Sequence, residues 1–299
     1  MVRCFPPITV FALLPLLVQA RDVYYQGDLA PLNIEPTFDK GYLAVYEPEH
    51  TIALYKPDGS LAFRAVPQVS GAKFASVRNA TPDDDGSLAI AVEYRLEKRN
   101  AGGVAVFDRA GRQTAFIVTS DGWSPTQVCF GADHSIWAIG WMGLNPPATG
   151  SADYFVLRKF SRDGRMLGAF LPRSSFEQEP VGPIVGGWQL RSANGRIGGL
   201  FYTTAVVPPG TKRRVGAWIE IDLLGNVVRQ MDLPEKTIVA FTGDGSLYAW
   251  GYRGGYSVLS PGANSWRPVS GTGNLLGTDG SSLVFQMPGA NLTVWSPID

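Results

Sequence analysis

The side chains that could carry out chemistry are few in this sequence, and histidine is the scarcest of them. Only His50 and His134 occur among the 299 residues. A zinc site or a Ser-His-Asp triad needs imidazole groups that converge with their partners. His134 occupies a turn position that glycine fills in the similar segments described below, which separates it from the longer loops. We therefore expect neither a histidine metal site nor a histidine-based hydrolase.

Carboxylates are the next candidates, because several oxygen atoms together can bind a hard cation. The segment Asp83-Asp84-Asp85-Gly86 begins like a calcium-binding loop. The EF-hand spacing also requires a glutamate at a fixed offset after the glycine, and "SLAIA" stands there instead. We therefore interpret this segment as an acidic β-turn.

The first twenty residues have the layout of a secretory signal peptide. Arg3 supplies the positive start, residues 8–18 form the apolar run, and Val18-Gln19-Ala20 is a small-residue cleavage site. The run is shorter than the roughly 20 apolar residues that span a bilayer, and an uncleaved anchor is the alternative. We expect an exported protein, periplasmic or extracellular, whose mature chain begins at Arg21 and has no transmembrane segment.

The composition of the remaining residues, 21–299, suits one large domain with a buried core. Apolar residues make up 45% of the sequence and charged residues 17%, with 26 Lys and Arg against 26 Asp and Glu. The absence of a basic block argues against nucleic-acid binding. Cys129 is the single cysteine after the expected signal peptide, so no internal disulfide can form. We expect a monomer stabilised by apolar burial.

Two classes of glycine-containing turn alternate along the chain. The first follows an aromatic or aliphatic residue, as in "YKPDGSLAF" at residues 55–63, and its glycines are Gly59, Gly111, Gly164, Gly225, Gly262 and Gly289. The second leads into an apolar strand, as in "DDGSLAIAV" at residues 84–92, with five similar segments near residues 38, 132, 193, 243 and 278. Glycine is expected there because tight hairpins require a positive φ.

Six pairs of alternating hairpins predict six units of four antiparallel strands. Each unit averages about 46 residues, near the roughly 40–50 of propeller blades. A β-sandwich, the alternative, does not predict six alternating pairs. We therefore expect an all-β, six-bladed β-propeller with four-stranded blades over residues 21–299. The last unit is one strand short, and "DVYYQ" at residues 22–26 can supply it, so that the N- and C-terminal strands close the ring in one blade.

The first unit resembles the NHL-type repeat. In "GYLAVYEPEHTIALYKPDGSLAF", residues 41–63, a strand, a short polar link, an aliphatic strand and Asp-Gly follow one another as in that family. The resemblance extends loosely over all six units and is best over the first three. It implies a propeller and no particular activity.

A weaker resemblance suggests a second function. "NIEPTFDKGYLAVY", residues 33–46, is similar to the first strand of gluconolactonase-like hydrolases at Glu35 and Pro36. That likeness implies a metal-dependent lactonase-type hydrolase, in which Glu35 binds one divalent cation such as Ca²⁺. The Asn and Asp ligands expected from later blades have no clear counterparts, and a hard cation needs several oxygen ligands. This hydrolase is the alternative to a binding protein without a metal or organic cofactor.

The two kinds of link in a propeller open on opposite faces. The hairpin turns described above share one face, here called the short-turn face. The links between second and third strands share the other, the long-loop face, with the crossovers between blades. On that face the links are long and varied, at residues 93–103, 141–153, 171–187 and 203–215. Length and irregularity on one face only predict a functional surface.

The long-loop face collects side chains suited to recognition. Arg and aromatic side chains are frequent in binding hot spots, and exposed aromatic rings also suit sugars. The candidate ligand-binding residues are Glu93, Tyr94, Arg95, Trp123, Trp141, Arg214, Tyr252 and Arg253. Trp141 and Tyr252 each directly follow a glycine at the end of an apolar strand, which leaves room for the ring to face the central funnel. We expect a binding or scaffold module for a protein, peptide or glycan rather than an enzyme.

Overall fold

The computed structural model describes residues 21–25, 36–97, 99–119, 122–142, 154–175, 189–207, 211–233, 238–251, 255–271, 273–287 and 292–298. Apart from one short 3-10 helix, Arg173–Ser175, the regular elements of the described chain are all β-strands. This confirms the all-β expectation. No helix in the described residues is long and apolar enough to cross a membrane.

The strands follow the chain in groups of four. The first group comprises β2 (Thr37–Asp39), β3 (Tyr42–Glu47), β4 (Thr51–Tyr55) and β5 (Leu61–Ala65). The second comprises β6 (Phe74–Pro82), β7 (Leu88–Leu96), β8 (Arg99–Phe107) and β9 (Gln113–Val118). The third comprises β10 (Trp123–Phe130), β11 (Ile136–Met142), β12 (Phe155–Phe160) and β13 (Met166–Pro172).

The later groups repeat the pattern. The fourth comprises β14 (Gln189–Ala193), β15 (Arg196–Val207), β16 (Thr211–Asp222) and β17 (Val227–Leu233). The fifth comprises β18 (Ile238–Phe241), β19 (Leu247–Trp250), β20 (Tyr256–Leu259) and β21 (Arg267–Val269). The last comprises β22 (Asn274–Thr278), β23 (Ser282–Gln286), β24 (Leu292–Pro297) and, from the other end of the chain, β1 (Arg21–Tyr24).

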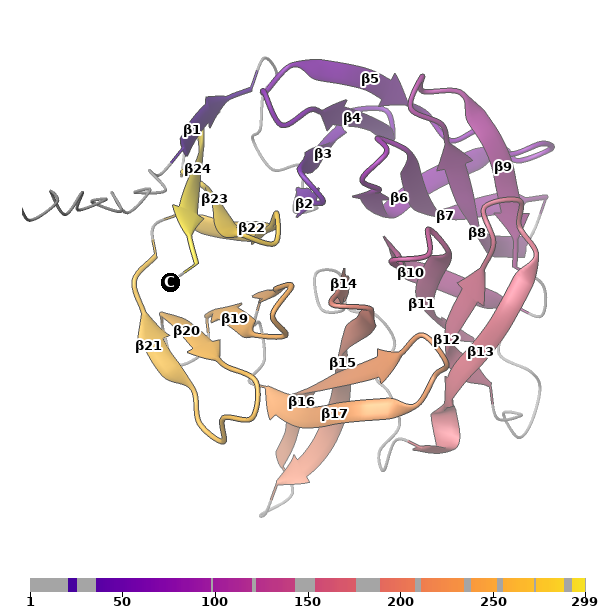
Figure 1. Ribbon diagram of the computed structural model, residues 1–299. Coiled ribbons are helices and arrows are strands. Elements are labelled where there is room, and N and C mark those ends of the chain that lie inside the picture. The colour runs from indigo at the N-terminus through magenta and orange to yellow at the C-terminus, as the bar shows by residue number, and fades with distance from the viewer. Residues whose placement is uncertain are drawn as a thin grey trace, which may run out of the picture.

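These groups stand around a ring, with β2, β14 and β22 among the strands nearest the centre (Figure 1). Consecutive strands within a group pair side by side, so four of the groups are separate four-stranded sheets. The first and last groups share one sheet through a parallel contact between β2 and β22. The described strands therefore form six four-stranded groups in a ring, and the β-propeller expectation is confirmed.

The two ends of the chain close the ring. β1 pairs antiparallel with β24, from Arg21 opposite Trp295 to Tyr24 opposite Leu292. Val23 is buried, and its carbonyl oxygen accepts a hydrogen bond from the Thr293 hydroxyl. The expected closure by N- and C-terminal strands is confirmed. The pairing gives β24 the outer partner that a C-terminal strand alone would lack.

The core lies between neighbouring blades. The largest cluster joins the third, fourth and fifth groups, and it buries Trp137 and Trp218 completely. Trp295 is buried where the last group meets the first, with its ring edge-on to Phe38. All three tryptophans lie in strands, and their burial shows that these indole rings fill space between blades.

The glycines of the repeated outer turns are required by packing as well as by backbone conformation. Gly111, Gly164 and Gly225 each have a positive φ, between 77° and 95°. A Cβ at Gly111 would lie 2.8 Å from the Phe63 ring in the preceding blade, and one at Gly225 would overlap the Phe170 ring. Each turn therefore rests on the outer strand of the blade before it. A Cβ at Gly262 would meet no atom within 4 Å, so the contact is absent there.

The long-loop face differs from the expectation at two places. Residues 93–103 and 203–215 were expected to be irregular loops, but they extend paired hairpins. β7 and β8 remain paired as far as Leu96 opposite Arg99, and β15 and β16 as far as Val207 opposite Thr211. The β-branched run "TTAVV" at residues 203–207 favours strand over loop. Residues 143–153 and 176–188 of the other two long links lie outside the described residues.

The two glycine environments predict different responses to a methyl group. Gly262→Ala should lower the free energy of unfolding by about 1 kcal/mol, because its positive φ disfavours a side chain. Gly225→Ala should cost about 3 kcal/mol, because the methyl group also collides with Phe170. Urea denaturation of both variants measures the difference. Equal losses would show that the Phe170 contact places no constraint on the turn.

Candidate functional site

Three of the candidate residues are consecutive in β7 and have different surroundings. Glu93 forms an ion pair with Arg78 from β6. Tyr94 is buried, with its ring edge-on to Phe116 at 5.4 Å between centroids, and burial raises the pKa of its hydroxyl. Arg95 is exposed. Successive side chains of a strand point to opposite faces of the sheet. The Tyr94 ring faces the core, so its expected place on the surface is wrong, whereas the Arg95 side chain reaches solvent.

Trp123 does not lie on the surface. Its side chain is fully buried between the second and third blades, with the Arg158 guanidinium carbon 4.4 Å from the ring centroid. A Cβ at Gly140 would overlap this ring, so the glycine provides the space that the indole fills. The exposed placement expected for Trp123 on the long-loop face is therefore wrong. Gly140 was expected to leave room for the Trp141 ring, and in the structure it also leaves room for the Trp123 ring.

Of the other candidate residues, the structure describes Trp141 and the strand position of Arg214. Trp141 lies opposite Ser124, is half-buried, and packs against the cluster between the third and fourth blades. Arg214 lies in β16 opposite Thr204. Tyr252, Arg253 and Glu35 lie outside the described residues. The long-loop face thus retains Glu93, Arg95 and Trp141 as described side chains that reach solvent, together with the strand position of Arg214.

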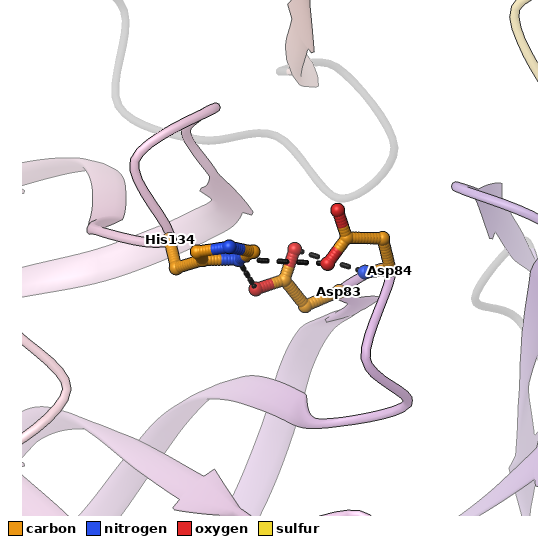
Figure 2. A group of neighbouring side chains, drawn as sticks. All are labelled: Asp83, Asp84 and His134. Carbon is orange, nitrogen blue, oxygen red and sulfur yellow. Dashed lines mark hydrogen bonds and ion pairs between the residues drawn. The ribbon is translucent and has the colours of Figure 1, made fainter.

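A dense group of charges lies on the short-turn face, where the sequence did not place a site. We call it the Asp83 cluster; it comprises Lys40, Asp83, Asp84, Asp85, His134 and Arg162. The buried Asp83 carboxylate is at its centre. Its Oδ1 accepts a hydrogen bond from Lys40 Nζ at 2.7 Å. Its Oδ2 lies 2.8 Å from His134 Nδ1 (Figure 2) and accepts a further hydrogen bond from Arg162.

Hairpin turns of three blades supply the cluster. Lys40 comes from the β2–β3 turn, Asp83 from the β6–β7 turn, and His134 from the β10–β11 turn. Lys40 and His134 have positive φ values, 49° and 56°, at positions where glycine would be the ordinary choice. Arg162 reaches in from the outer β12–β13 turn. Lys40 and Arg162 also lie over the Phe130 ring, at 5.9 and 5.2 Å from its centroid.

The electrostatics of the cluster favour ionised carboxylates. Burial alone would raise the pKa of Asp83, but hydrogen bonds and charge from Lys40, with a hydrogen bond from His134, hold it below the usual value. Partial burial also opposes ionisation of Asp85. Its ion pair with Arg162 and the Ser87 amide nonetheless lower its pKa to about 2. At neutral pH the cluster is thus a network of alternating charges.

The cluster is a poor metal site. Asp83, Asp84 and His134 bring possible ligand atoms within 4.8 Å of one another, as no other such trio does in the described part of the chain. Both Asp83 oxygens, however, already accept hydrogen bonds from cationic side chains. A divalent ion would lie beside an ammonium group and would have to displace a guanidinium group. We assign the cluster to holding the turns of three blades together.

The interpretation of residues 83–86 as an acidic β-turn is confirmed. The Gly86 amide donates to the Asp83 carbonyl oxygen at 3.1 Å, and Gly86 has a φ of 80°. His134 lies on the short-turn face, as expected, and there its ring contacts the carboxylates of Asp83 and Asp84. Residues 40, 83, 134 and 162 lie far apart in the sequence, and no local pattern indicates that their turns meet. The sequence offered only one indication of this contact: residues 40, 83 and 134 all lie in the first hairpin turn of their repeat units.

Asp39 is a second buried acid beside the cluster, at the end of β2. Burial raises its pKa from 3.8 to about 6, although Lys40 and Arg191 partly offset the effect. Unlike Asp83, it therefore lacks enough positive charge or hydrogen bonding to favour its ionised form. The inner end of the first blade thus contains a carboxyl group whose pKa is about 6.

No protein-family model matches the chain, and no curated protein matches it. A solved protein of unknown function from Bacteroides caccae is 11% identical, over 75% of this chain and 76% of that chain, with a TM-score of 0.40. The calcium-binding protein regucalcin from Agrobacterium tumefaciens is 15% identical over 73% and 67%, with a TM-score of 0.42. BamB from Moraxella catarrhalis is 12% identical over 92% and 96%, with a TM-score of 0.38. These similarities assign no function.

Asp39 predicts a specific pH dependence of stability. The native state keeps the Asp39 proton up to about pH 6, whereas the unfolded chain releases it near 3.8. The contribution of this group is therefore fully present below about pH 4 and is lost as the pH rises through about 6, by roughly 3 kcal/mol in total. Asp39→Asn cannot titrate. It should match the wild type near pH 4 and be more stable at pH 8 in urea denaturation. A variant that is less stable at pH 8 would contradict this assignment.

The Asp83 cluster predicts that its central carboxylate matters most. Asp83→Asn keeps the size of the side chain but leaves Lys40 and Arg162 without their buried anion, which should cost about 3 kcal/mol of unfolding free energy. Asp84→Asn is the matched control, because the Asp84 side chain is 60% exposed, and it should cost less than about 1 kcal/mol. Thermal or urea unfolding gives both values. Similar losses in the two variants would argue against a central role for Asp83.

Proposed function

We propose that residues 21–299 form one exported β-propeller domain that acts as a monomeric binding or scaffold module. It recognises a protein, peptide or glycan through the long-loop face. Export is supported by the charge, apolar run and cleavage site of residues 1–20. The proposal involves no metal or organic cofactor. The lactonase-type alternative depends on Glu35, which lies outside the described residues, and no other observation favours it.

The observation that carries the proposal is the unequal construction of the two faces. On the short-turn face the described hairpins are closed by tight turns, in which Asp side chains accept hydrogen bonds from turn amides, as Asp58, Asp108 and Asp222 do. On the opposite face, β7 and β8 run for nine residues each and β15 and β16 for twelve, against four each for β19 and β20. In Figure 1 the β15–β16 hairpin extends past the outline of the neighbouring blades.

The two long hairpins reach further than the outer strands of their blades. β9 pairs with β8 only from Gly103 onward, and β17 pairs with β16 only from Gly216 onward. The hairpin tips thus project beyond the outer strands of their own blades. Trp141 lies half-buried in the blade between them. Projecting hairpins beside a partly exposed aromatic residue support recognition of a macromolecule.

Site-specific photo-cross-linking in the native host tests the proposal. A photoreactive residue is introduced at Arg95, Trp141 or Arg214 on the long-loop face, and at Asp58, Asp163 or Asp279 on the short-turn face as matched controls. We expect a discrete cross-linked product from the first set and none from the second. Products from the short-turn positions alone, or from neither set, would contradict the proposed binding face. Protease resistance of each variant controls for folding.

A further inference from the structure

The tip of the β7–β8 hairpin, here called the β7–β8 tip, collects cations that have no charged partner among the described residues. The tip comprises residues 95–97, 99 and 100, and Lys73, next to the start of the adjacent strand, is joined to it. The Lys73 amide donates to the Arg95 carbonyl oxygen at 3.0 Å, and Arg99 lies across the hairpin from Leu96. Lys73, Arg95 and Arg99 are exposed. None of them makes an ion pair or a side-chain hydrogen bond with any residue in the described part of the chain.

The balance of charge at the β7–β8 tip is positive. Glu93 is already paired with Arg78. That leaves Glu97 as the one anion against Lys73, Arg95 and Arg99, and Lys98 adds a further cation in the sequence. The whole protein, in contrast, has equal numbers of acidic and basic side chains. The excess at the tip is therefore a local feature and does not follow from a basic composition.

Exposed cations on the short-turn face lie close to negative charge. Lys56, Arg109 and Arg165 are also exposed, but each shares its turn with an aspartate: Asp58, Asp108 and Asp163 respectively. A cation beside a carboxylate presents little net field to an approaching ligand. The β7–β8 tip lacks such carboxylates beyond Glu97. Uncompensated positive charge on a projecting tip favours an anionic partner by electrostatic complementarity.

The geometry of the tip favours a flexible chain over a flat surface. Arg95 lies opposite Asn100, whereas Leu96 lies opposite Arg99, so Arg95 and Arg99 belong to opposite sides of the hairpin. A planar membrane surface can contact only one side at a time, while an extended segment can pass over the tip and reach both. Leu96 is 38% exposed and shares its side with Arg99. An apolar contact there suits a polypeptide better than a polysaccharide.

The second projecting hairpin repeats the charge pattern. β16 carries Lys212, Arg213 and Arg214 at consecutive positions opposite Val206, Ala205 and Thr204. No acidic residue occurs between residues 203 and 215. Two basic hairpins therefore flank the blade that contains Trp141.

We propose that the β7–β8 tip binds an extended acidic segment of a partner protein that also carries apolar side chains. The segment pairs its carboxylates with Lys73, Arg95 and Arg99 and lays an apolar side chain against Leu96. Its path continues towards Trp141 and the basic end of β16. This inference rests on the proposed long-loop binding face and specifies the chemical class of its ligand.

Fluorescence anisotropy with defined probes tests the inference. The probe is a labelled peptide in which Glu residues are interspersed with Leu and Ser, and its counterparts carry Gln or Lys in place of Glu. The wild-type protein should bind the Glu peptide at least about tenfold more tightly than the Gln peptide at low ionic strength. Binding should weaken towards about 0.15 M salt as screening increases. The Lys peptide should not bind.

A matched pair of variants localises the binding. Lys73→Glu/Arg95→Glu/Arg99→Glu should reduce affinity for the Glu peptide at least about tenfold. Lys56→Glu/Arg109→Glu/Arg165→Glu makes the same change in net charge on the short-turn face and should reduce it much less. The neutral variant Lys73→Gln/Arg95→Gln/Arg99→Gln should be intermediate. Unchanged thermal unfolding of these surface variants shows that the fold is retained.

Several outcomes would overturn the inference. These are absence of Glu-peptide binding by the wild type, equal losses in the two charge-reversed variants, or tighter binding to anionic lipid vesicles or to an anionic polysaccharide than to the peptide. Photo-cross-linking at Arg214 in the charge-reversed tip variant separates this inference from the proposed function. If the product persists, the long-loop face still binds a partner but the acidic-segment inference is wrong. If the wild type gives no product either, the proposed function is wrong.

Discussion

A four-stranded blade has two apolar faces and can bury neither of them by itself. Each face must meet the face of a neighbouring blade, so the stability of every blade depends on the completed ring. The core reflects this constraint, because its clusters lie between blades. The turn glycines serve the same packing, since Gly111 and Gly225 let one blade approach the outer strand of the one before it. At this size, without a disulfide, apolar contacts between blades are the main source of stability.

Charge reinforces the ring on one face and is left available on the other. On the short-turn face, buried Asp83 and Glu220 each accept ion pairs from two basic side chains, and Arg229 also reaches the Gly245 carbonyl oxygen in the next blade. These contacts link turns that lie far apart in the sequence. On the long-loop face the cations of the β7–β8 tip have no such partners within the described part of the chain. One face is therefore built for cohesion, while the other has charges that can be used in binding.

The sequence predicted the architecture well because the features that determine it are local. The turn around Gly59 and the turn at residues 83–86 could be recognised from adjacent residues, and the missing strand near Val23 followed from counting hairpins. The candidate site was predicted less well because its features depend on contacts between blades. Tyr94 belongs to a long link, and Trp123 begins a strand directly after a loop, so both positions suggested the surface. In the structure both rings are buried against neighbouring strands and blades, and these contacts exist only in the packed ring.

Regular and irregular links could not be distinguished from length alone. Residues 93–103 and 203–215 were recognised as long, but pairing between Val207 and Thr211 depends on whether two extended segments stay in register. The Asp83 cluster was missed for a similar reason. Lys40, His134 and Arg162 become neighbours only through the angular spacing of blades. The inner turns of a ring converge at its centre, but which of their side chains meet depends on how the blades pack.

Closure by β1 and β24 also has a consequence for the order of events in folding. Val23 and Thr293 are 270 residues apart in the chain, so their contact has a very high contact order. Bringing together two strands so far apart in the chain is entropically unfavourable unless the intervening blades have already formed and reduced the effective loop. Pairing of β1 with β24 must therefore wait for the blades between them, and the seam between these two strands is where the finished ring can first begin to open.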